Sequence, residues 1–367
     1  DGNGMIIISD KPLEFNDDNK WFVLREYNNG RIEYPGTIEV LNDYLFFERP
    51  SKDTVSADYA KNANGAHPRV YGTKADFDRV RSLRGTDEYF DHVYNKLIAA
   101  ADEIVNAPDN NIQYVFEGYR MYNQGDKLDD YMTKLGFAYQ MTGDRKYVDR
   151  AWKEFEILFT FPDINPAHII DTGMIQIGIS VGYDWMYDAW TDEQRRQIEE
   201  FEMTKGLGVM SGIYYGDFNY QAFVSAKWVS NYNAFVNAGN IVASLAFMDV
   251  DPEFCSETLS KAIRSTEYTL KGFVPDGAWC EGPNYWGLTT RFLTDIFTTL
   301  EASCGTEYGL TKYQGLSKTV DFFTAISSYG GYNNYHDSYQ TLTRSFFSYA
   351  YFAKRFDNAL LYLPRKT

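Results

Sequence analysis

The chain has 367 residues, of which 44% are hydrophobic, so it is long enough to bury a substantial core in one large domain or two modest ones. A formal net charge of -16 argues against general affinity for nucleic acid or for an anionic membrane surface. No stretch is long and apolar enough to span a bilayer, and Cys255, Cys280 and Cys304 have the spacing of neither a zinc knuckle nor a disulfide framework.

Aromatic residues are frequent, at 17% of the chain, and include 30 tyrosines and 7 tryptophans. Tyrosine and tryptophan combine a flat apolar face with a polar edge, and sugar rings present the same mixture. Most of these residues are expected to fill a wide helical core, and the remainder suit a carbohydrate-binding surface. An acidic carbohydrate would need positive charge concentrated locally, because the chain as a whole is acidic.

Residues 1–60 have the pattern of a β segment followed by a linker. The runs Trp21–Leu24 and Ile38–Leu41 are strand-like, and Asn29-Gly30 is a strong signal for a two-residue hairpin turn. The polar run over 61–65 predicts a linker to the following domain. Because the first residue is Asp1, the chain is consistent with loss of a signal peptide, and we expect a secreted or periplasmic protein of bacterial type.

After His67-Pro68 the hydrophobic pattern becomes helical and remains so. It predicts one helix or two over 73–104, another over 144–161, and further helices from about 231, 252, 284, 311 and 338. Thr191 to Gln194 form a capping box, and an apolar stripe at helical spacing consists of Ile170, Met174, Ile177, Val181 and Trp185. Short polar connections favour antiparallel helical hairpins stacked in a ring or an array, and the lack of a fixed repeat period disfavours a solenoid.

Two features of this helical region have a structural interpretation. Gly178-Ile179-Ser180-Val181-Gly182 matches the G-x-S-x-G elbow of hydrolases, but that elbow requires a strand, a sharp turn and then a helix. Because the match lies inside a helical run, we interpret it as small residues that allow close helix packing. His168 stands at a helix start, where it either caps the helix or makes a hydrogen bond inside the bundle, or else lines a cleft; the structural role is the preferred interpretation.

Three clusters of polar and aromatic residues are candidates for chemistry. The first contains Trp228, Asn231, Tyr232 and Asn233, and a single helix cap would require only one of these asparagines. The second, over 275–287, is a Gly- and Pro-rich loop that presents Glu281, Tyr285 and Trp286 ahead of a helix with Arg291. Loops with several aromatic residues and a carboxylate on a helical scaffold are commonly functional.

The third cluster, over 331–338, places His336 between a tyrosine and an aspartate. A histidine in such surroundings is a candidate general acid or base, because its pKa lies near neutrality. It could also be one ligand of a metal, but a single candidate ligand is weak evidence for a metal site.

At these segments the chain resembles the heparinase II/III-like polysaccharide lyases. The similar stretches occur in the order of the family and extend over most of residues 67–355: 67–70, 135–144, 165–171, 182–188, 230–237 and 276–286. The resemblance implies an incomplete (α/α) toroid over 67–367, preceded by the short β segment. In the family the toroid is normally followed by β-sandwich domains, and we expect that domain to be absent from this chain.

The resemblance implies β-elimination at a uronic acid. That reaction neutralises the uronate carboxylate, removes the proton from C5 and protonates the leaving glycosidic oxygen. By position, Asn231 matches the asparagine that neutralises the carboxylate, Tyr285 is the candidate catalytic tyrosine, and His336 is a candidate second base. Some relatives have histidine directly after this asparagine, whereas this chain has Tyr232, which leaves open whether Tyr232 takes part.

Further residues are expected to bind the acidic polysaccharide. Glu281 is expected to orient Tyr285 or to accept a hydrogen bond from a sugar hydroxyl, and Arg344 and Lys227 to supply local positive charge. The expected lining of the sugar subsites consists of Trp228, Asn233, Trp286, Arg291 and His168. The reaction requires no cofactor, a structural metal ion is not indicated, and the sequence leaves the oligomeric state open.

Two alternatives remain at the level of sequence. A glycoside hydrolase on a similar helical toroid needs two carboxylates across the scissile bond, and Glu281 with Asp337 could form such a pair. A non-catalytic glycan-binding protein would bind the polymer without cleaving it. The sequence does not identify the polymer, so glycosaminoglycans, alginate and other uronates stay open.

Overall fold

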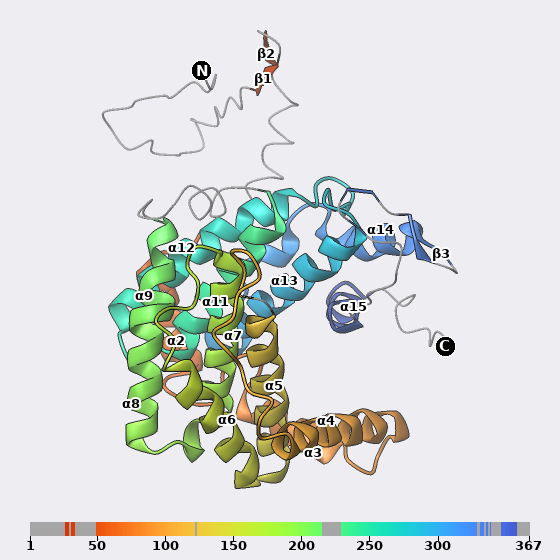
Figure 1. The fold of residues 1–367 in the computed structure, drawn as a ribbon. Helices are drawn as coiled ribbons and strands as arrows, with labels where there is room; N and C mark the ends of the chain where they lie inside the picture. The colour runs from red at the N-terminus through yellow and green to blue at the C-terminus, as the bar shows by residue number, and fades with distance from the viewer. Residues whose placement is uncertain are drawn as a thin grey trace.

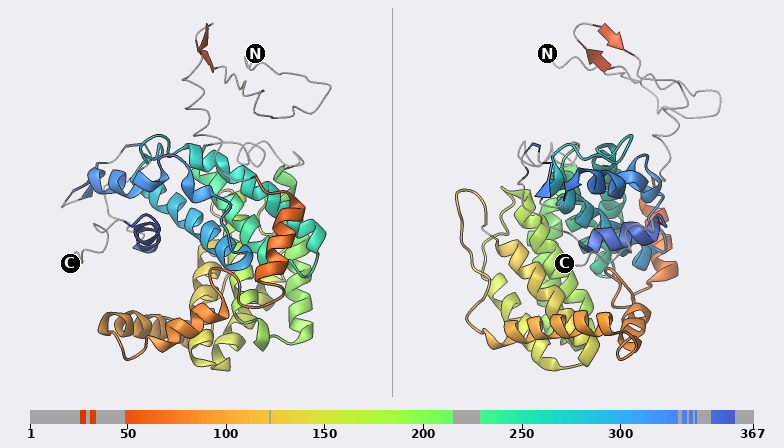
Figure 2. Two further views of the ribbon diagram at one scale, coloured as in Figure 1. Left: turned by 180° about the vertical axis from the view of Figure 1, so that it is seen from behind. Right: turned by 90° about the vertical axis from the view of Figure 1, so that its right-hand side faces the viewer.

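The computed structural model describes residues 26–28, 31–33, 49–121, 123–214, 229–328, 331–333, 335–336, 338 and 346–357. Over these residues the chain is mainly helical, as the sequence predicts, with two short two-stranded hairpins. Figure 1 shows α5 (Gln124–Thr142), α7 (Ile169–Trp185) and α11 (Asn231–Ala246) side by side. In both views of Figure 2, α3 (Lys74–Ser82) and α4 (Glu88–Asn106) lie across the bottom of the molecule.

The first hairpin lies where the Asn-Gly signal predicts it. β1 (Glu26–Asn28) pairs antiparallel with β2 (Arg31–Glu33), and the register places Asn28 opposite Arg31. The predicted strands Trp21–Leu24 and Ile38–Leu41 lie outside the described residues.

Over 52–62 the expectation of β structure and linker is wrong, because α2 (Lys52–Asn62) is a helix. Ser51 caps it by accepting from the N–H of Thr54, and Val55 and Tyr59, one turn apart, are both buried. The helix packs against α12 (Pro252–Lys271) and α13 (Pro283–Cys304), so the helical region begins before His67.

The remaining helices follow the sequence pattern closely. The predicted helix over 73–104 is two helices, α3 and α4, and those expected near 144, 231, 252 and 284 are α6 (Arg145–Leu158), α11, α12 and α13. Thr191 forms the predicted capping box at the start of α8 (Asp192–Phe201). Between α8 and α11 the chain forms short turns: η2 (Glu202–Gly206, a π-helical turn), α9 (Leu207–Met210) and η3 (Ser211–Tyr214).

The C-terminal part departs from prediction. The helix expected near 311 is replaced by two short 3-10 turns, and the helix expected near 338 begins within the described residues at 346. The elements of this part are η4 (Leu310–Lys312), η5 (Leu316–Lys318), α14 (Thr319–Ile326), β3 (Ser327–Ser328), β4 (Gly331–Tyr332) and α15 (Phe346–Arg355). A further 3-10 turn, η1 (Tyr187–Ala189), lies between α7 and α8. Gly309 and Gly315, both with positive φ, precede the two 3-10 turns and interrupt the helical periodicity.

Four helices, α5, α7, α11 and α13, run parallel and form what we call the inner layer. Gly125 meets Met174 near the start of α5 and α7, and Gly136 meets Trp185 near their ends. A Cβ at Gly178 would lie 2.9 Å from the Leu128 side chain, which confirms that the G-x-S-x-G match serves close helix packing. Gly173 contacts the backbone of α11 in the same way, and the Phe235 and Phe292 rings of α11 and α13 are 4.0 Å apart.

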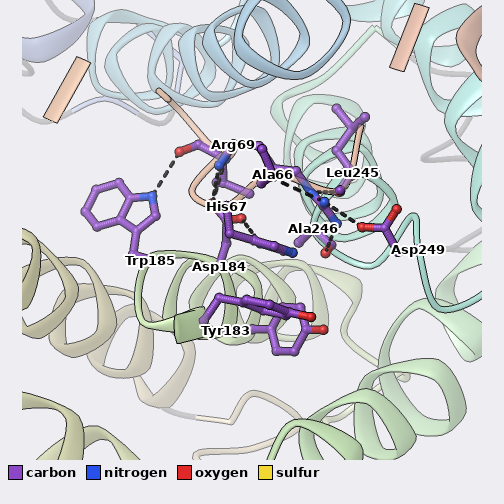
Figure 3. A network of polar contacts seen from close by, with 12 residues as sticks. Ala66, His67, Arg69, Tyr183, Asp184, Trp185, Leu245, Ala246 and Asp249 are labelled. Atoms are coloured by element: carbon purple, nitrogen blue, oxygen red, sulfur yellow. Dashed lines mark hydrogen bonds and ion pairs between the residues drawn. The ribbon is translucent and has the colours of Figure 1, made fainter. Parts of the chain in front are cut away.

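The C-terminal end of the inner layer is closed by the segment that follows α2 (Figure 3). The Asp184 carboxylate accepts from the backbone N–H groups of Arg69 and Val70, at 2.8 and 2.7 Å. The Arg69 side chain is 1% exposed and donates to the carbonyls of Leu245 and Ala246 at the end of α11. A cation at this position complements the helix dipole and satisfies carbonyls that have no partner within the helix.

His67 belongs to the same network and has a structural role. Its Nδ1 lies 2.6 Å from Asp184 Oδ1, and its ring stacks on Tyr187 with centroids 3.7 Å apart. Burial lowers the pKa of His67. Ser303 of α13 donates to the Arg69 carbonyl, so the segment joins α7, α11 and α13 at one end.

Candidate functional site

The N-terminal ends of the four inner helices lie together, and none has a capping hydrogen bond from its own N-cap side chain. The uncapped positions are Asn123, His168, Ser230 and Gly282. By contrast, six surrounding helices have such a cap, from the side chains of Ser51, Thr73, Asp87, Asp144, Thr191 and Asp251. The parallel dipoles of the inner helices place their positive ends together here, which favours a negative charge. Glu281 and Ser338 accept from the N–H groups of Asn231 and Asn284 at the starts of α11 and α13.

Asn231 and Glu281 form the centre of this end. One carboxylate oxygen of Glu281 accepts from the Asn231 backbone N–H and the other from its side-chain Nδ2, both at 2.7 Å. Burial raises the pKa of Glu281, and the two bonds from Asn231 oppose that rise. Asn231 is 2% exposed, and its Oδ1 has no hydrogen-bond partner within the described part of the chain. Glu281 therefore fixes the carboxamide while leaving its oxygen and second N–H for a ligand.

Tyr232 and Tyr285 lie beside this pair, together with an arginine. Burial raises the pKa of Tyr232, and the Arg120 guanidinium opposes that rise. Arg120 interacts with the Tyr119 side chain, which raises the pKa of Arg120, and it lies within electrostatic reach of Tyr232 and Tyr285. Among the residues that the structure describes, no ion pair joins Arg120 to a carboxylate, so its charge is available to an anion.

His168 also lies beside Tyr119 and Tyr232. Its ring meets Tyr119 and Tyr232 edge-on, with centroid separations of 5.3 and 6.2 Å. Nδ1 lies 3.0 Å from Asp171 Oδ2, but neither ring nitrogen has a hydrogen-bond partner with suitable geometry in the described ranges. His168 makes no capping hydrogen bond to α7, so the capping part of the preferred interpretation is wrong, but the residue is 2% exposed and contacts Asp171 inside the bundle.

His336 approaches the site from the segment after β4. It is exposed, and its charge influences the Glu281 carboxyl group. A glycine makes this approach feasible: Gly282 has φ +90°, and a Cβ there would lie 2.2 Å from Ser338 Oγ and 2.4 Å from the Tyr335 carbonyl. Ser338 Oγ accepts from the N–H of Asn284, which holds this segment against the start of α13.

Three predicted sugar contacts have structural roles instead. Asn233 is fully buried, and its side chain bonds Thr269 and Ser265 of α12. Trp286 is also fully buried: its indole N–H donates to Thr319 and its ring stacks on Phe323. These two expectations are wrong because both side chains point into the core.

Arg291, the third, forms an ion pair with Asp129 that links α13 to α5. Burial raises the pKa of the nearby Asp295 to about 7. The positive charge of Arg291 is thus matched locally, and it does not supply the cation that the site was expected to need. Trp228, Lys227, Arg344 and Asp337 lie outside the described residues.

Sequence reasoning missed Tyr119 and Arg120. They lie in the loop over 107–123, which joins α4 to α5 and runs back along α5: Tyr131 donates to the Asn110 carbonyl, and the Gln113 N–H donates to the Gln124 side chain. The available signal was a run of three aromatic residues and an arginine within 114–120, similar in composition to the three clusters that were recognised.

Within the described ranges, no group of three or more histidine, cysteine, aspartate or glutamate side chains is arranged to hold a metal ion. The same residues contain no helix with the length and apolar character needed to cross a membrane. The three cysteines are unpaired. No protein-family model matches the chain, and no curated protein matches it.

Proposed function

We propose that this chain is the helical domain of a polysaccharide lyase that cleaves a uronate-containing polymer by β-elimination. The observation that carries the proposal is the grouping of Asn231, Tyr285 and Arg120 at the N-terminal end of four parallel helices, where Arg120 has no ion-pair partner within the described residues. That end is favourable for an anion although the chain carries a net charge of -16.

The first requirement of the reaction is to neutralise the uronate carboxylate. The C5 proton is only weakly acidic, and its removal places negative charge on that carboxylate in the transition state. The second N–H of Asn231 and the Arg120 guanidinium are the donors for this role. Glu281 acts as a positioning residue, because its two bonds to Asn231 fix the orientation of the carboxamide before substrate binds.

The second requirement is proton transfer at C5 and at the glycosidic oxygen. Tyr285 and Tyr232 supply two phenols on the same side of Arg120, whose charge favours a phenolate in either of them. We assign Tyr285 the exchange of protons with substrate and Tyr232 the second phenol. His336 assists from the exposed edge of the site.

The proposal includes an incomplete (α/α) toroid as the architecture. Two-residue and five-residue connections make α6 antiparallel to α5 and α12 antiparallel to α11, which supports an outer layer around the inner one. A polymeric acidic sugar is met outside the cytoplasm, so a secreted or periplasmic protein is part of the same proposal.

The test is a panel of uronate polysaccharides incubated with the chain, with product followed by the ultraviolet absorbance of the unsaturated sugar that β-elimination creates. We expect absorbance to appear with at least one polymer and to be lost in Asn231→Ala. Val242→Ala, a buried position near the other end of the same helix, serves as the matched control.

Other outcomes separate the alternatives. Reducing ends released without ultraviolet absorbance would identify a hydrolase and reject the lyase. Binding of a polymer without any cleavage would identify a glycan-binding protein.

A further inference from the structure

The loop over 111–121 exposes a group of aromatic side chains. Tyr114, Phe116 and Tyr119 are 39%, 43% and 57% exposed, and Val115 between them is 39% exposed. No other segment of the described residues has so many large exposed apolar side chains so close in sequence. Exposing contiguous apolar surface is unfavourable in water, and such patches commonly mark a binding surface.

This loop is held in place along its whole length. The Ile112 N–H donates to Glu154, and the Met121 N–H donates to Asp171. Between them, two backbone hydrogen bonds join Glu117 and Arg120 around Gly118, which has φ +62°. The aromatic side chains are therefore presented on an ordered backbone, so a ligand that stacks on them does not have to order the loop first.

The exposed aromatics are continuous with the candidate site. The Tyr119 ring contacts His168, and the adjoining Arg120 lies beside Tyr232 and Tyr285. Tyr114 and Phe116 lie on the far side of the same turn, with their ring centroids 4.9 Å apart and nearly perpendicular. A polymer bound at Arg120 would pass over these rings if it extended in this direction.

The charges differ between the two sides of the turn. On the site side the charged group is the Arg120 guanidinium. Beside the exposed aromatic pair, the Tyr114 hydroxyl donates to Asp163, at 3.2 Å, and the exposed Glu117, which follows Phe116 in the chain, is a second carboxylate. A sugar that carries a carboxylate or sulfate is favoured at the first position and disfavoured at the second.

We infer that Tyr114 and Phe116 form a stacking platform for an uncharged sugar ring next to the uronate held at Arg120. This inference rests on the proposed function, which supplies the uronate, and it narrows the substrate class. The preferred polymer alternates uronate with an uncharged sugar, such as an N-acetylated hexosamine without sulfate, and is not a homopolymer of uronate.

The experiment is calorimetric titration of the chain with two probes of equal length, a hyaluronan hexasaccharide and a polymannuronate hexasaccharide. We expect the hyaluronan probe to bind more tightly. In Phe116→Ala its affinity falls by about tenfold, the size expected for loss of one aromatic stacking contact. Phe116→Tyr retains the affinity, and Tyr89→Ala, at a 78% exposed tyrosine near the opposite end of the molecule, leaves it unchanged.

Equal affinity of Phe116→Ala and the unmodified chain for the hyaluronan probe would overturn the platform, as would tighter binding of polymannuronate or failure of both probes to bind. Failure of the proposed lyase reaction can be distinguished from failure of the stacking platform. If Phe116→Ala weakens hyaluronan binding but no uronate polymer yields an unsaturated product, the platform stands and the lyase does not.

Discussion

The two ends of the inner layer are built from the same four helices in opposite ways. At the C-terminal end, the Arg69 guanidinium has the carbonyls of Leu245 and Ala246 and the Asp249 carboxylate as partners. At the N-terminal end, no inner helix is capped by its own N-cap side chain, and the buried Asn231 Oδ1 lacks a partner in the described residues. Six surrounding helices do have such a cap, so we interpret the N-terminal end as a ligand-binding surface and the C-terminal end as a part that stabilises the fold.

The largest effect is expected at the closed end. Arg69→Met would leave the carbonyls of Leu245 and Ala246 and the Asp249 carboxylate without their donor, and removing one partner of such a buried network costs about 3–5 kcal/mol. Urea unfolding measures this loss. Arg196→Met, at an exposed ion pair with Glu193, should change stability by less than about 0.5 kcal/mol. Equal stability of the two variants would contradict a structural role for the network.

Between the two ends, a buried carboxyl group predicts an unusual pH dependence. Glu202 is fully buried beside Gln176, and burial raises its pKa to about 8. The folded state thus holds a proton that the unfolded state releases from about pH 4.5, so this group lowers stability as pH rises from about 4.5 through about 8.

Glu202→Gln removes that titration. The variant should match the unmodified chain near pH 4 and exceed its stability at pH 9 by an amount on the order of a few kcal/mol. Denaturant titrations at both pH values check this. A variant that is less stable at pH 9 would show that the carboxylate is stabilised in the folded state.

Substitutions at the N-terminal end of the inner layer should change activity and leave the free energy of unfolding unchanged. Arg120→Gln removes an exposed cation without an ion-pair partner in the described residues, so unfolding should be unchanged. Loss of a charge-assisted contact to the uronate should lower kcat/KM by about 10- to 100-fold and flatten its salt dependence. Steady-state kinetics at two salt concentrations measure both. A kcat/KM equal to that of the unmodified chain would remove Arg120 from the site.

The smallest effect on stability is expected at the starts of two helices, α8 and α11. Thr191→Ala breaks a capping box and should cost about 1 kcal/mol. Ser230→Ala, at the start of α11, should cost nothing measurable, because its side chain makes no capping bond. Thermal unfolding of the two variants checks the difference, and an equal loss would mean that Ser230 caps α11 in solution.

Local features of this fold could be predicted from the sequence because their causes are local. The β1–β2 pairing, the Thr191 capping box and the packing role of Gly178 and Gly182 depend on a few adjacent residues. The start of α2 could also have been found, since Ser51 and the Val55–Tyr59 spacing are a helix signature that the search for strands obscured.

The candidate site was predictable in part. The clusters around Asn231 and Glu281 were recognised by composition, and the structure brings them into contact. Tyr285 and Trp286 are adjacent in sequence but about 100° apart on a helix, so only one could face the site, and the choice depends on Thr319 and Phe323, far along the chain. Arg120 reaches the site through the path of its loop, which no local pattern encodes.

Two substitutions test whether the N-terminal end of the inner layer carries out the chemistry while the C-terminal end stabilises the fold. Tyr285→Phe removes a hydroxyl at the N-terminal end. Tyr59→Phe removes the hydroxyl that donates to Asp249 at the C-terminal end. Formation of unsaturated product is measured for both on the best polymer of the panel. We predict that Tyr285→Phe lowers kcat by at least about 100-fold with unchanged unfolding, and that Tyr59→Phe keeps kcat and unfolds more easily. Retained kcat in Tyr285→Phe, or an equal loss in both variants, would contradict the account.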